Sequence, residues 1–466
     1  MVYTMPEFLE RRYNPQSRTI LSVISLVSYV LTKVAVTVYA GGLVFQQVFG
    51  IKELWGIDFF WIAAIGLVVL TALYTIFGGM KSVLYTSVLQ TPILLLGSLI
   101  ILVLGFKELG GWDEMMRVCG AVTVNDYGDT MTNLIRSNDD ANFPWLGALI
   151  GSAIIGFWYW CTDQFIVQRV LSGKNEKEAR RGTIFGAYLK LLPVFLFLIP
   201  GMIAFALHQK YIGAGGEGFL PMLANGTANA DAAFPTLVAK LLPAGVKGLV
   251  VCGILAALMS SLASLFNSSA MLFTIDFYKR FRPETPEKKL VGIGQIATVV
   301  IVILGILWIP IMRSVGDVLY TYLQDVQSVL APGIAAAFLL GICWKRTSAQ
   351  GGMWGLIAGM VIGLTRLGAK GYCSNAGEVA DSTFKYLFYD MNWLFFCGWM
   401  FLFCIIVVIV VSLATEAPTA EKIQGLVFGT ATKEQKAATR ASWDHWDIIH
   451  TAIILAITAA FYWYFW

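Results

Sequence analysis

The amino-acid sequence predicts an all-α protein with many membrane-spanning helices. Hydrophobic residues make up 57% of its 466 residues, whereas charged residues make up only 13%. The mean hydropathy is +0.70, and a typical soluble domain carries about 25% charged residues. Apolar runs long enough to cross a bilayer, which takes about 20 residues, recur along the chain. These observations exclude an ordinary soluble enzyme and predict a polytopic helical membrane protein.

The apolar runs predict about eleven transmembrane helices, given the ~20-residue requirement. We expect these helices near 19–49, 59–77, 83–106, 145–171, 182–207, 245–275, 291–312, 316–343, 351–368, 392–414 and 446–466.

Basic residues predict how the chain is oriented in the membrane. The leading segment carries Arg11, Arg12 and Arg18, and alternate loops after it carry further lysines and arginines. Short loops rich in lysine and arginine stay on the cytoplasmic side. We therefore expect a multi-pass protein of the plasma (inner) membrane. Its N-terminus is expected to be cytoplasmic and, with an odd number of spans, its C-terminus external.

The stretch from Gly248 to Arg280 carries a row of serines inside an apolar span. Ala257, Ser260 and Ser261 stand at positions i, i+3 and i+4, so they share one helical face. A helical carbonyl keeps a spare lone pair. One carbonyl with two hydroxyls is therefore a fragment of an oxygen cage for a hard cation such as sodium. The alternative is that these small polar residues let helices pack closely in lipid.

Two lysines lie inside predicted spans, where an ionisable residue is a functional candidate by default. Lys190 precedes Pro193 and Pro200, which are expected to interrupt the helix. It either donates into a central cavity or snorkels from a helix end. Lys33, in SYVLTKVAVTVYAGG, has no evident partner in the sequence, and we interpret it as structural.

Gln324 and Gln327 lie near the start of the span TYLQDVQSVLAPGIAAAFLL. Pro332-Gly333 follows them and predicts a break that exposes backbone to a site, as in the interrupted helices of secondary transporters. The alternative is that the two amides form hydrogen bonds between helices.

An aromatic cluster ends the fourth predicted span, in IIGFWYWCTDQFIVQRV. Tyr159 and Trp160 belong either to an interfacial aromatic belt or to a ring surface on which a sugar stacks. Next to them, Asp163 and Arg169 are expected to neutralise each other near the inner surface.

Other classes of function are disfavoured. None of the three histidines, His208, His445 and His450, lies in the middle of an apolar span, which argues against a haem or a histidine metal site. No span carries a base–nucleophile pair, so we do not expect an enzyme. No charge-dense segment is present to bind nucleic acid.

A series of motifs occurs along the chain: TMPEFLERRYN, GGMKSVLYTSVLQT, WYWCTDQFIVQR, YLKLLP, FPTLVAKLLP, ALMSSLASLFNSSAMLFTID, YLQ and FLLGICWKR. Together they resemble the sodium/solute symporter family, specifically its sodium/glucose cotransporter branch. The resemblance covers almost the whole chain. It implies an inverted-repeat core of five plus five helices, with broken helices and a site near the bilayer midplane.

The resemblance also implies how the chain is divided and which residues form the site. Residues 1–466 form a single transporter domain, in which 1–106 is a remnant of the first inverted repeat. Residues 145–343 are the second repeat, and 351–466 form additional C-terminal helices. The sodium ligands are expected from Ala257, Ser260 and Ser261; the solute is expected to meet the inner-gate residue Tyr159, its neighbour Trp160, Lys190 and Gln324.

Three departures from the family pattern limit what the resemblance implies. The chain starts late, so we expect it to lack the first core helix and most of the second, which supply further sodium and sugar ligands. Gly156 stands where sugar-binding relatives have Asn or Thr. Ser87 replaces an aspartate of the sodium path, and Ala263 replaces a hydroxyl residue of a second sodium site. A cation site without its carboxylate is unfavourable in a low dielectric, so we expect one sodium per solute.

The function implied by the resemblance is sodium-coupled symport of a sugar or related polyol by alternating access, with sodium as the coupling ion. The alternatives are sodium symport of another small solute, such as a vitamin, sialic acid or an amino acid, and a non-transporting sensor or fragment.

Overall fold

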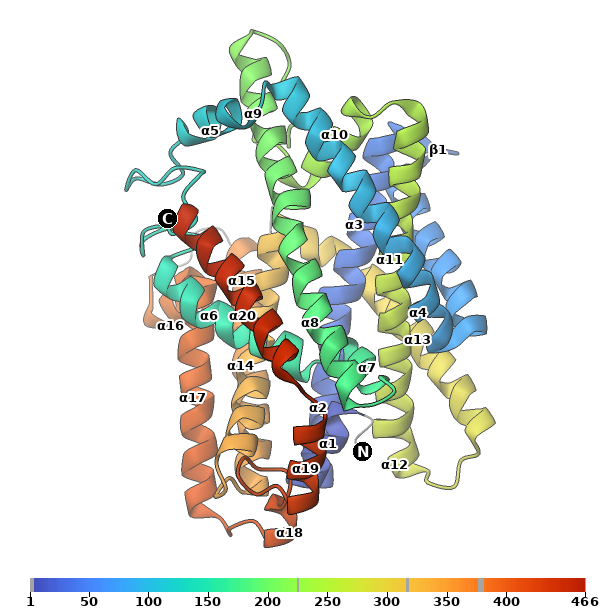
Figure 1. Cartoon of the computed structure of the whole chain (residues 1–466), viewed down its shortest axis with the longest axis vertical. Coiled ribbons are helices and arrows are strands. Elements are labelled where there is room, and N and C mark those ends of the chain that lie inside the picture. Colours follow the sequence, from blue (N-terminus) through green and yellow to red (C-terminus); the bar gives the residue numbers. More distant parts are fainter. Residues whose placement is uncertain (1–3, 224–225, 316–317, 376–380, 466) are drawn as a thin grey trace. The chain divides into compact units, whose positions relative to one another are not determined.

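The computed structural model describes residues 4–223, 226–315, 318–375 and 381–465, and most of this part of the chain is helical. Ten described helices are long and apolar enough to cross a membrane, and Phe59–Leu73 forms a shorter apolar helix segment. The chain divides into two compact units, each of which contains several of these helices. Figure 1 shows the helices and their labels.

Unit 1 comprises Met1–Lys33, Ser137–Ile184 and Ser268–Ile453. Its helices are α1 (Met5–Arg12), α2 (Pro15–Ser28), α6 (Trp145–Phe157), α7 (Gln164–Leu171), α12 (Lys279–Phe281), α13 (Glu287–Val315), α14 (Leu319–Cys343), α15 (Ala349–Asn375), α16 (Thr383–Lys385), α17 (Trp393–Ala414), α18 (Ala420–Ile423) and α19 (Lys433–Ala441). Short π-helical segments η2 (Trp158–Thr162), η5 (Leu272–Tyr278) and η6 (Tyr386–Asp390) join some of them.

Unit 2 comprises Val34–Arg136, Phe185–Asn267 and Ile454–Trp466. It contains α3 (Ala35–Phe49), β1 (Glu53–Leu54), β2 (Ile57–Asp58), α4 (Phe59–Leu109), α5 (Trp112–Gly120), the π-helical η3 (Val194–Leu198), α9 (Ile199–Gly213), the short 3₁₀ helix η4 (Ala230–Ala232) and α10 (Ala233–Leu241). Four elements have residues in both units: the π-helical η1 (Tyr29–Val34), α8 (Glu176–Pro193), α11 (Ala244–Met271) and α20 (His445–Tyr464).

Each unit has its own apolar core. In unit 2, residues of α4, α9, α10 and α11 pack together, with Ile101, Ile203 and Leu237 fully buried. In unit 1, the core joins α1 and α2 to α6, α14 and α17, with Leu9 and Phe338 fully buried. The helices that form these two cores therefore bury one side against other helices.

The spans predicted at 59–77 and 83–106 both fall in α4, whose apolar segments are Phe59–Leu73 and Gln90–Leu109. The structure joins both ranges in one continuous helix of 51 residues. Two glycines in the GGMKS sequence between them lower helix stability by about 1 kcal/mol each relative to alanine. They keep their backbone N–H groups, however, so the ladder of helical hydrogen bonds is not interrupted there.

The helices α14, α15 and α17 lie side by side and form the most closely packed part of unit 1 (Figure 1). A Cβ atom added at Gly333 of α14 would lie 2.9 Å from the Cα of Gly359 in α15. The predicted break at Pro332-Gly333 is wrong, because α14 continues from Leu319 to Cys343 with Pro332 inside it. Gly333 instead lets two backbones approach closely, as small residues do in membrane helices.

The prolines after Lys190 interrupt the regular α-helix with a π-helical segment, although the helical stretch continues from Glu176 to Gly213. α8 ends at Pro193, the π-helical η3 follows, and Pro200 lies at the start of α9. Proline removes a backbone donor and clashes with the preceding turn. A π-helical segment between two prolines is the local result.

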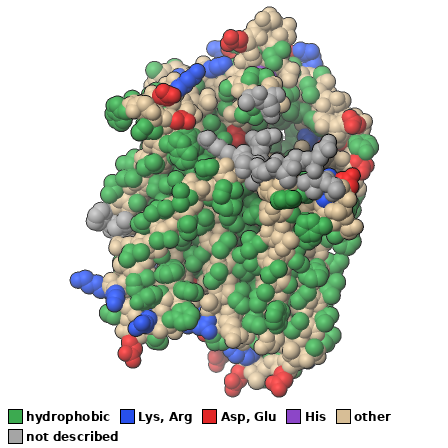
Figure 2. Space-filling view, turned by 180° about the vertical axis from the view of Figure 1, so that it is seen from behind, with side chains coloured by type: hydrophobic (Ala, Val, Ile, Leu, Met, Phe, Trp, Pro, Cys, Tyr) green, Lys and Arg blue, Asp and Glu red, His purple; other side chains and the backbone are tan. Residues whose placement is uncertain are grey.

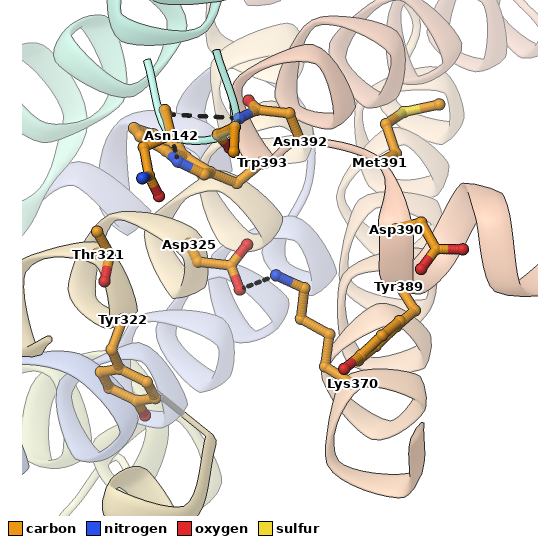
Figure 3. Close-up of a pocket in the computed structure, with 11 residues that line it drawn as sticks. Asn142, Thr321, Tyr322, Asp325, Lys370, Tyr389, Asp390, Met391, Asn392 and Trp393 are labelled. Atoms are coloured by element: carbon orange, nitrogen blue, oxygen red, sulfur yellow. Dashed lines mark hydrogen bonds and ion pairs between the residues drawn. The ribbon is translucent and has the colours of Figure 1, made fainter. Parts of the chain in front are cut away.

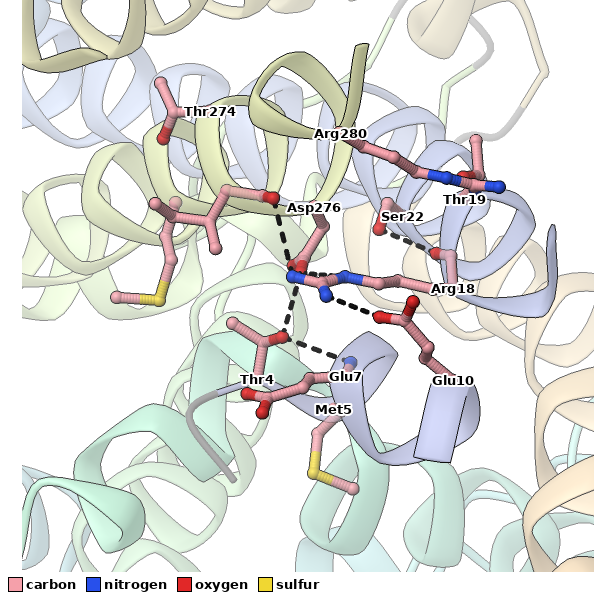
Figure 4. Close-up of polar contacts among 12 residues, drawn as sticks. Thr4, Met5, Glu7, Glu10, Arg18, Thr19, Ser22, Thr274, Asp276 and Arg280 are labelled. Atoms are coloured by element: carbon pink, nitrogen blue, oxygen red, sulfur yellow. Dashed lines mark hydrogen bonds and ion pairs between the residues drawn. The ribbon is translucent and has the colours of Figure 1, made fainter. Parts of the chain in front are cut away.

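A polar network ties the first two helices of unit 1 to the segment that follows α11 (Figure 4). Arg18 of α2 donates through Nε to Asp276 of η5 at 2.7 Å, and through Nη1 to Glu10 at 2.6 Å. The hydroxyl of Thr4 donates to Asp276 at 3.0 Å. Asp276 is fully buried. A buried carboxylate is costly unless paired, so these donors fix the position of η5.

The exposed surface is largely apolar. Figure 2 shows hydrophobic side chains over much of the visible face, with most Lys, Arg, Asp and Glu side chains near its upper and lower edges. Exposed hydrophobic residues on the candidate spans include Val103, Leu307 and Val410. Apolar patches of this extent mark contact with a membrane rather than water, and the chain is a multi-pass membrane protein.

Candidate functional site

A buried ion pair lies at the break in the fourth predicted span. Lys33 of η1 binds the carboxylate of Asp163 through its ammonium group. Both residues are buried. The hydroxyl of Tyr29 donates to Oδ1 of Asp163 at 3.0 Å, and the backbone N–H of Phe165 donates to the same atom at 3.1 Å. The carboxylate therefore has a charged partner and two further donors, as a buried carboxylate requires.

Asp163 also interrupts the backbone of this span. It is extended, with φ −78° and ψ 120°, between the π-helical η2 and the helix α7. Its side chain caps α7 by accepting from Phe165, which is the role that Asp favours at a helix N-terminus. One residue thus ends one helical segment, starts the next and binds Lys33.

The structure gives two residues of this region a partner that their sequence spacing does not indicate. Asp163 pairs with Lys33, whereas the guanidinium of Arg169 lies over the ring of Phe165 at 5.9 Å. Lys33, which had no evident partner, has one that lies 130 residues further along the chain. Sequence spacing favoured the nearby arginine, because no local pattern reveals a partner on another helix.

The aromatic residues of η2 surround this ion pair. The ammonium of Lys33 lies 5.3 Å from the ring centre of Tyr159 and 4.7 Å from that of Tyr29. Tyr159 is half-buried and meets Trp160 edge to face, with ring centres 5.3 Å apart. Trp160 is 51% exposed. Cation–π contacts hold the ammonium among these rings, so the ion pair also determines where Tyr159 lies.

The other predicted solute residues lie on separate elements. Gln324 of α14 donates from Nε2 to the hydroxyl of Tyr320 at 3.0 Å. α14 packs against η2, the segment that carries Tyr159 and Trp160, within unit 1. Lys190 is exposed on α8 and belongs to unit 2. Within unit 1 the structure therefore brings together the elements that carry three of the four residues.

The predicted sodium residues lie together on α11 in unit 2. Ala257, Ser260 and Ser261 are all half-buried. The hydroxyl of Ser264 donates to the carbonyl oxygen of Ser260 at 3.0 Å, which is a hydrogen bond within the helix. The hydroxyl of Ser260 forms a different bond, because it lies 2.6 Å from the hydroxyl of Ser87 on α4.

No pattern in the sequence predicted the contact between Ser87 and Ser260. Ser87 was singled out only as a replacement for an aspartate of the sodium path. The structure places its hydroxyl oxygen beside those of α11, so two helices supply neutral oxygen atoms to the same place. Hard cations are bound by such oxygens. The hydroxyl residues in YTSVLQT, inside an apolar run, were the available signal.

Comparisons with known proteins agree with this architecture. The model of the family described as sodium:solute symporter family matches residues 1–359. The chain is 35% identical to the sodium/mannose cotransporter SLC5A10 of Bos taurus, over 100% of this chain and 80% of that protein. It is also 35% identical to the human sodium/myo-inositol cotransporter 2, over 92% of this chain and 64% of that protein. The sodium/glucose cotransporter 4 of Mus musculus matches at 35% identity, over 92% of this chain and 63% of that protein.

A solved structure shows a similar fold. It is a substrate-bound outward-open state of a Na+-coupled sialic acid symporter, with a TM-score of 0.66 and 22% sequence identity. The match covers 89% of this chain and 78% of that one. At this identity the likeness concerns the fold alone. The chain spans less than two thirds of the length of the human and mouse relatives named above.

Proposed function

The chain belongs to the sodium:solute symporter family, and we propose that it couples sodium entry to the transport of a sugar or related polyol across the plasma membrane. It belongs to a family of transporters, not of enzymes. The relatives named for mannose, myo-inositol and glucose support a polyhydroxylated solute. The family supports sodium as the coupling ion.

In this proposal Ala257, Ser260 and Ser261 supply one half of the sodium site. The contact of Ser260 with Ser87 is the observation that supports it most directly, because it adds a fourth neutral oxygen from a second helix. Sodium bound at this place would hold α4 and α11 of unit 2 together. The same ion would favour the state that binds solute, which is how an ion couples to a solute by population shift.

The solute is proposed to bind Tyr159, Trp160, Lys190 and Gln324. Rings offer flat apolar area to the faces of a sugar, whereas the ammonium and the amide offer donors to its hydroxyls. The buried pair of Lys33 and Asp163 supports this role indirectly, because it fixes the segment on which Tyr159 and Trp160 lie. Alternating access would follow by rigid-body movement of one helix bundle against the other.

The proposal includes the orientation predicted from basic residues. The N-terminus is cytoplasmic and the C-terminus external. The cluster of Arg18 and Glu10 with Asp276 then lies toward the cytoplasm, and the start of α14 lies toward the outside. The repeat assignment, with residues 1–106, 145–343 and 351–466 as its three parts, is also part of this proposal.

Uptake into proteoliposomes tests the function and the site together. We expect sodium-dependent uptake of labelled glucose, mannose or myo-inositol by the full chain. Ser261→Ala should raise the sodium concentration for half-maximal uptake by about tenfold, since a lost charge-assisted contact is worth about 1.5–3 kcal/mol. It should change the apparent solute affinity much less. Gln324→Ala should weaken the apparent solute affinity and change the sodium requirement much less.

The control for this test is Ser264→Ala, which removes a hydroxyl that bonds to its own helix. It should leave the dependence of uptake on sodium concentration and on solute concentration unchanged. Equal effects of Ser261→Ala and Gln324→Ala on both dependences would mean that these residues only pack helices. Uptake of a vitamin, a sialic acid or an amino acid in place of sugars would correct the solute class.

A further inference from the structure

A small pocket of about 230 Å³ lies in unit 1, between α14, α15 and the link from η6 to α17. Thr321, Tyr322 and Asp325 line it from α14, and Lys370 lines it from α15. The residues from Tyr389 to Trp393 and the pair Ala141 and Asn142 complete its wall. Figure 3 shows Asp325 and Lys370 pointing toward each other, with Asn392 and Trp393 on another side.

The pocket is separate from the residues proposed for transport. Neither Tyr159, Trp160 nor Gln324 lines it. Asp325 directly follows Gln324, and successive residues of an α-helix point about 100° apart. The two side chains therefore lie on different faces of α14, so the pocket is not an extension of that site.

Two charged side chains of the pocket form an ion pair. The ammonium of Lys370 lies 2.5 Å from Oδ2 of Asp325. Behind it, Arg366 lies 3.6 Å from Oδ1 of Asp325 and is fully buried. Asp390 adds an exposed carboxylate at the rim. Asp325 and Lys370 neutralise each other inside the pocket, and Asp390 faces solvent. The pocket therefore favours a neutral occupant over an ion that would need its own countercharge.

Arg366 is held in place by the backbone and takes no direct part in binding. Its guanidinium donates to the carbonyl oxygens of Met391 and Leu387, at 2.7 and 3.4 Å, and lies over the ring of Phe396 at 4.0 Å. It thereby fixes the link that carries Tyr389 and Asn392. Lys370, whose side chain is 20% exposed, is the cation that a solute can reach.

We propose that this pocket is a second binding site for a neutral polyol or monosaccharide. An ammonium has three donors and a carboxylate only acceptors, so Lys370 and Asp325 together present donors and acceptors side by side. A hydroxyl is the group that both donates and accepts, and two neighbouring hydroxyls match such a pair. Tyr389 and Trp393 add the aromatic surface that a sugar ring covers. The volume suits one small solute and is below the ~300–1,000 Å³ of drug-sized sites.

The inference goes beyond the proposed function, on which it rests only for the solute class. With the orientation proposed above, the start of α14 and the end of α15 are external. The pocket then binds solute at the outer side, before transport. The solute must compete with the contact between Lys370 and Asp325. Its affinity for this pocket is therefore lower than for the proposed transport site.

Hydrogen exchange of the purified full chain tests the second site. The experiment uses the Gln324→Ala background, in which the proposed transport site is impaired, and titrates myo-inositol, mannose and glucose. We expect slower exchange in the peptide that covers η6 and residues 391–393. Lys370→Gln should raise the half-saturating concentration about tenfold, the cost of a hydrogen bond to a charged group. This variant keeps Asp325 and Arg366 together and therefore avoids an unpaired buried charge.

Asp381→Asn is the matched control, because Asp381 binds Lys385 at 2.8 Å on the surface and does not line the pocket. It should leave the titration unchanged. The proposal would be overturned if none of the three sugars slowed exchange in this peptide, or if Lys370→Gln left the half-saturating sugar concentration unchanged. It would also be overturned if gluconate or betaine slowed exchange as much as the sugars do. Failure of sodium-dependent uptake would reject the proposed transport function without affecting this exchange measurement.

Discussion

Lys33 and Asp163 form a buried ion pair between two segments that are otherwise mostly apolar. Removing two charges from water costs several kcal/mol per ion, and the attraction between them offsets this only with good geometry and further hydrogen bonds. Tyr29 and the backbone of Phe165 supply those bonds. The cost of burying the two charges is therefore offset as long as both residues of the pair are present.

Lys33→Met should strongly destabilise the chain. It leaves the carboxylate of Asp163 buried without a countercharge, and breaking such a pair typically costs about 3–5 kcal/mol. Thermal unfolding in detergent should show a lower Tm. The double variant Lys33→Met with Asp163→Asn should recover part of the loss, because no unpaired charge then remains.

The matched control is Lys385→Met, which removes the partner of an exposed carboxylate, Asp381. Exposed ion pairs contribute little to stability, so its Tm should equal that of the unmodified chain. A Tm for Lys33→Met that matches Lys385→Met would show that Asp163 is not buried as described.

At the scale of elements, the contact between α14 and α15 depends on glycine. A Cβ atom on Gly359 would lie 2.6 Å from the Cα of Gly333 and 3.2 Å from its nitrogen. Such a contact is with backbone and cannot be relieved by a rotamer change. The two helices must therefore separate if either glycine gains a side chain.

Gly359→Ala should lower the Tm, because overpacking of a close contact typically costs about 1–3 kcal/mol. Gly368→Ala on the same helix is the control, since a Cβ there meets no atom within 4 Å. In that open position alanine favours the helix by about 1 kcal/mol, so its Tm should stay equal or rise. Opposite results for the two variants would contradict the close packing of α14 on α15.

At the scale of the whole molecule, the oxygens proposed for sodium are neutral. The set on α11 gains Ser87 as a further hydroxyl, where relatives are expected to carry a carboxylate. Ala263 is fully buried and has no hydroxyl to offer a second ion. A second cation held by dipoles alone is unfavourable in a low dielectric.

We therefore expect one sodium per solute. Reversal potentials of the solute-dependent current, measured at several sodium gradients, should fit a 1:1 stoichiometry. The variant Ser87→Asp restores a carboxylate beside Ser260 and should strengthen sodium binding. Reversal potentials that require two sodium ions per solute in the unmodified chain would contradict the predicted 1:1 stoichiometry.

The sequence by itself determined the class of the protein, the position of most spans and the hydroxyl face of α11. These are local properties, because hydropathy and helical period are read within one contiguous segment. The prolines after Lys190 belong to the same group, since a missing backbone donor acts within its own turn. The prediction failed where it extended a local rule too far, at Pro332 inside α14.

The tertiary structure alone decided which polar groups meet. Lys33 and Asp163 are 130 residues apart, Ser87 and Ser260 are 173 apart, and Lys370 and Asp325 are 45 apart. Each pair joins two separate segments, and its formation depends on how the helices of those segments are rotated and shifted against each other. Rotation and shift are determined by packing across the interface, where glycines such as Gly333 let the backbones approach. No pattern within a single segment contains that information.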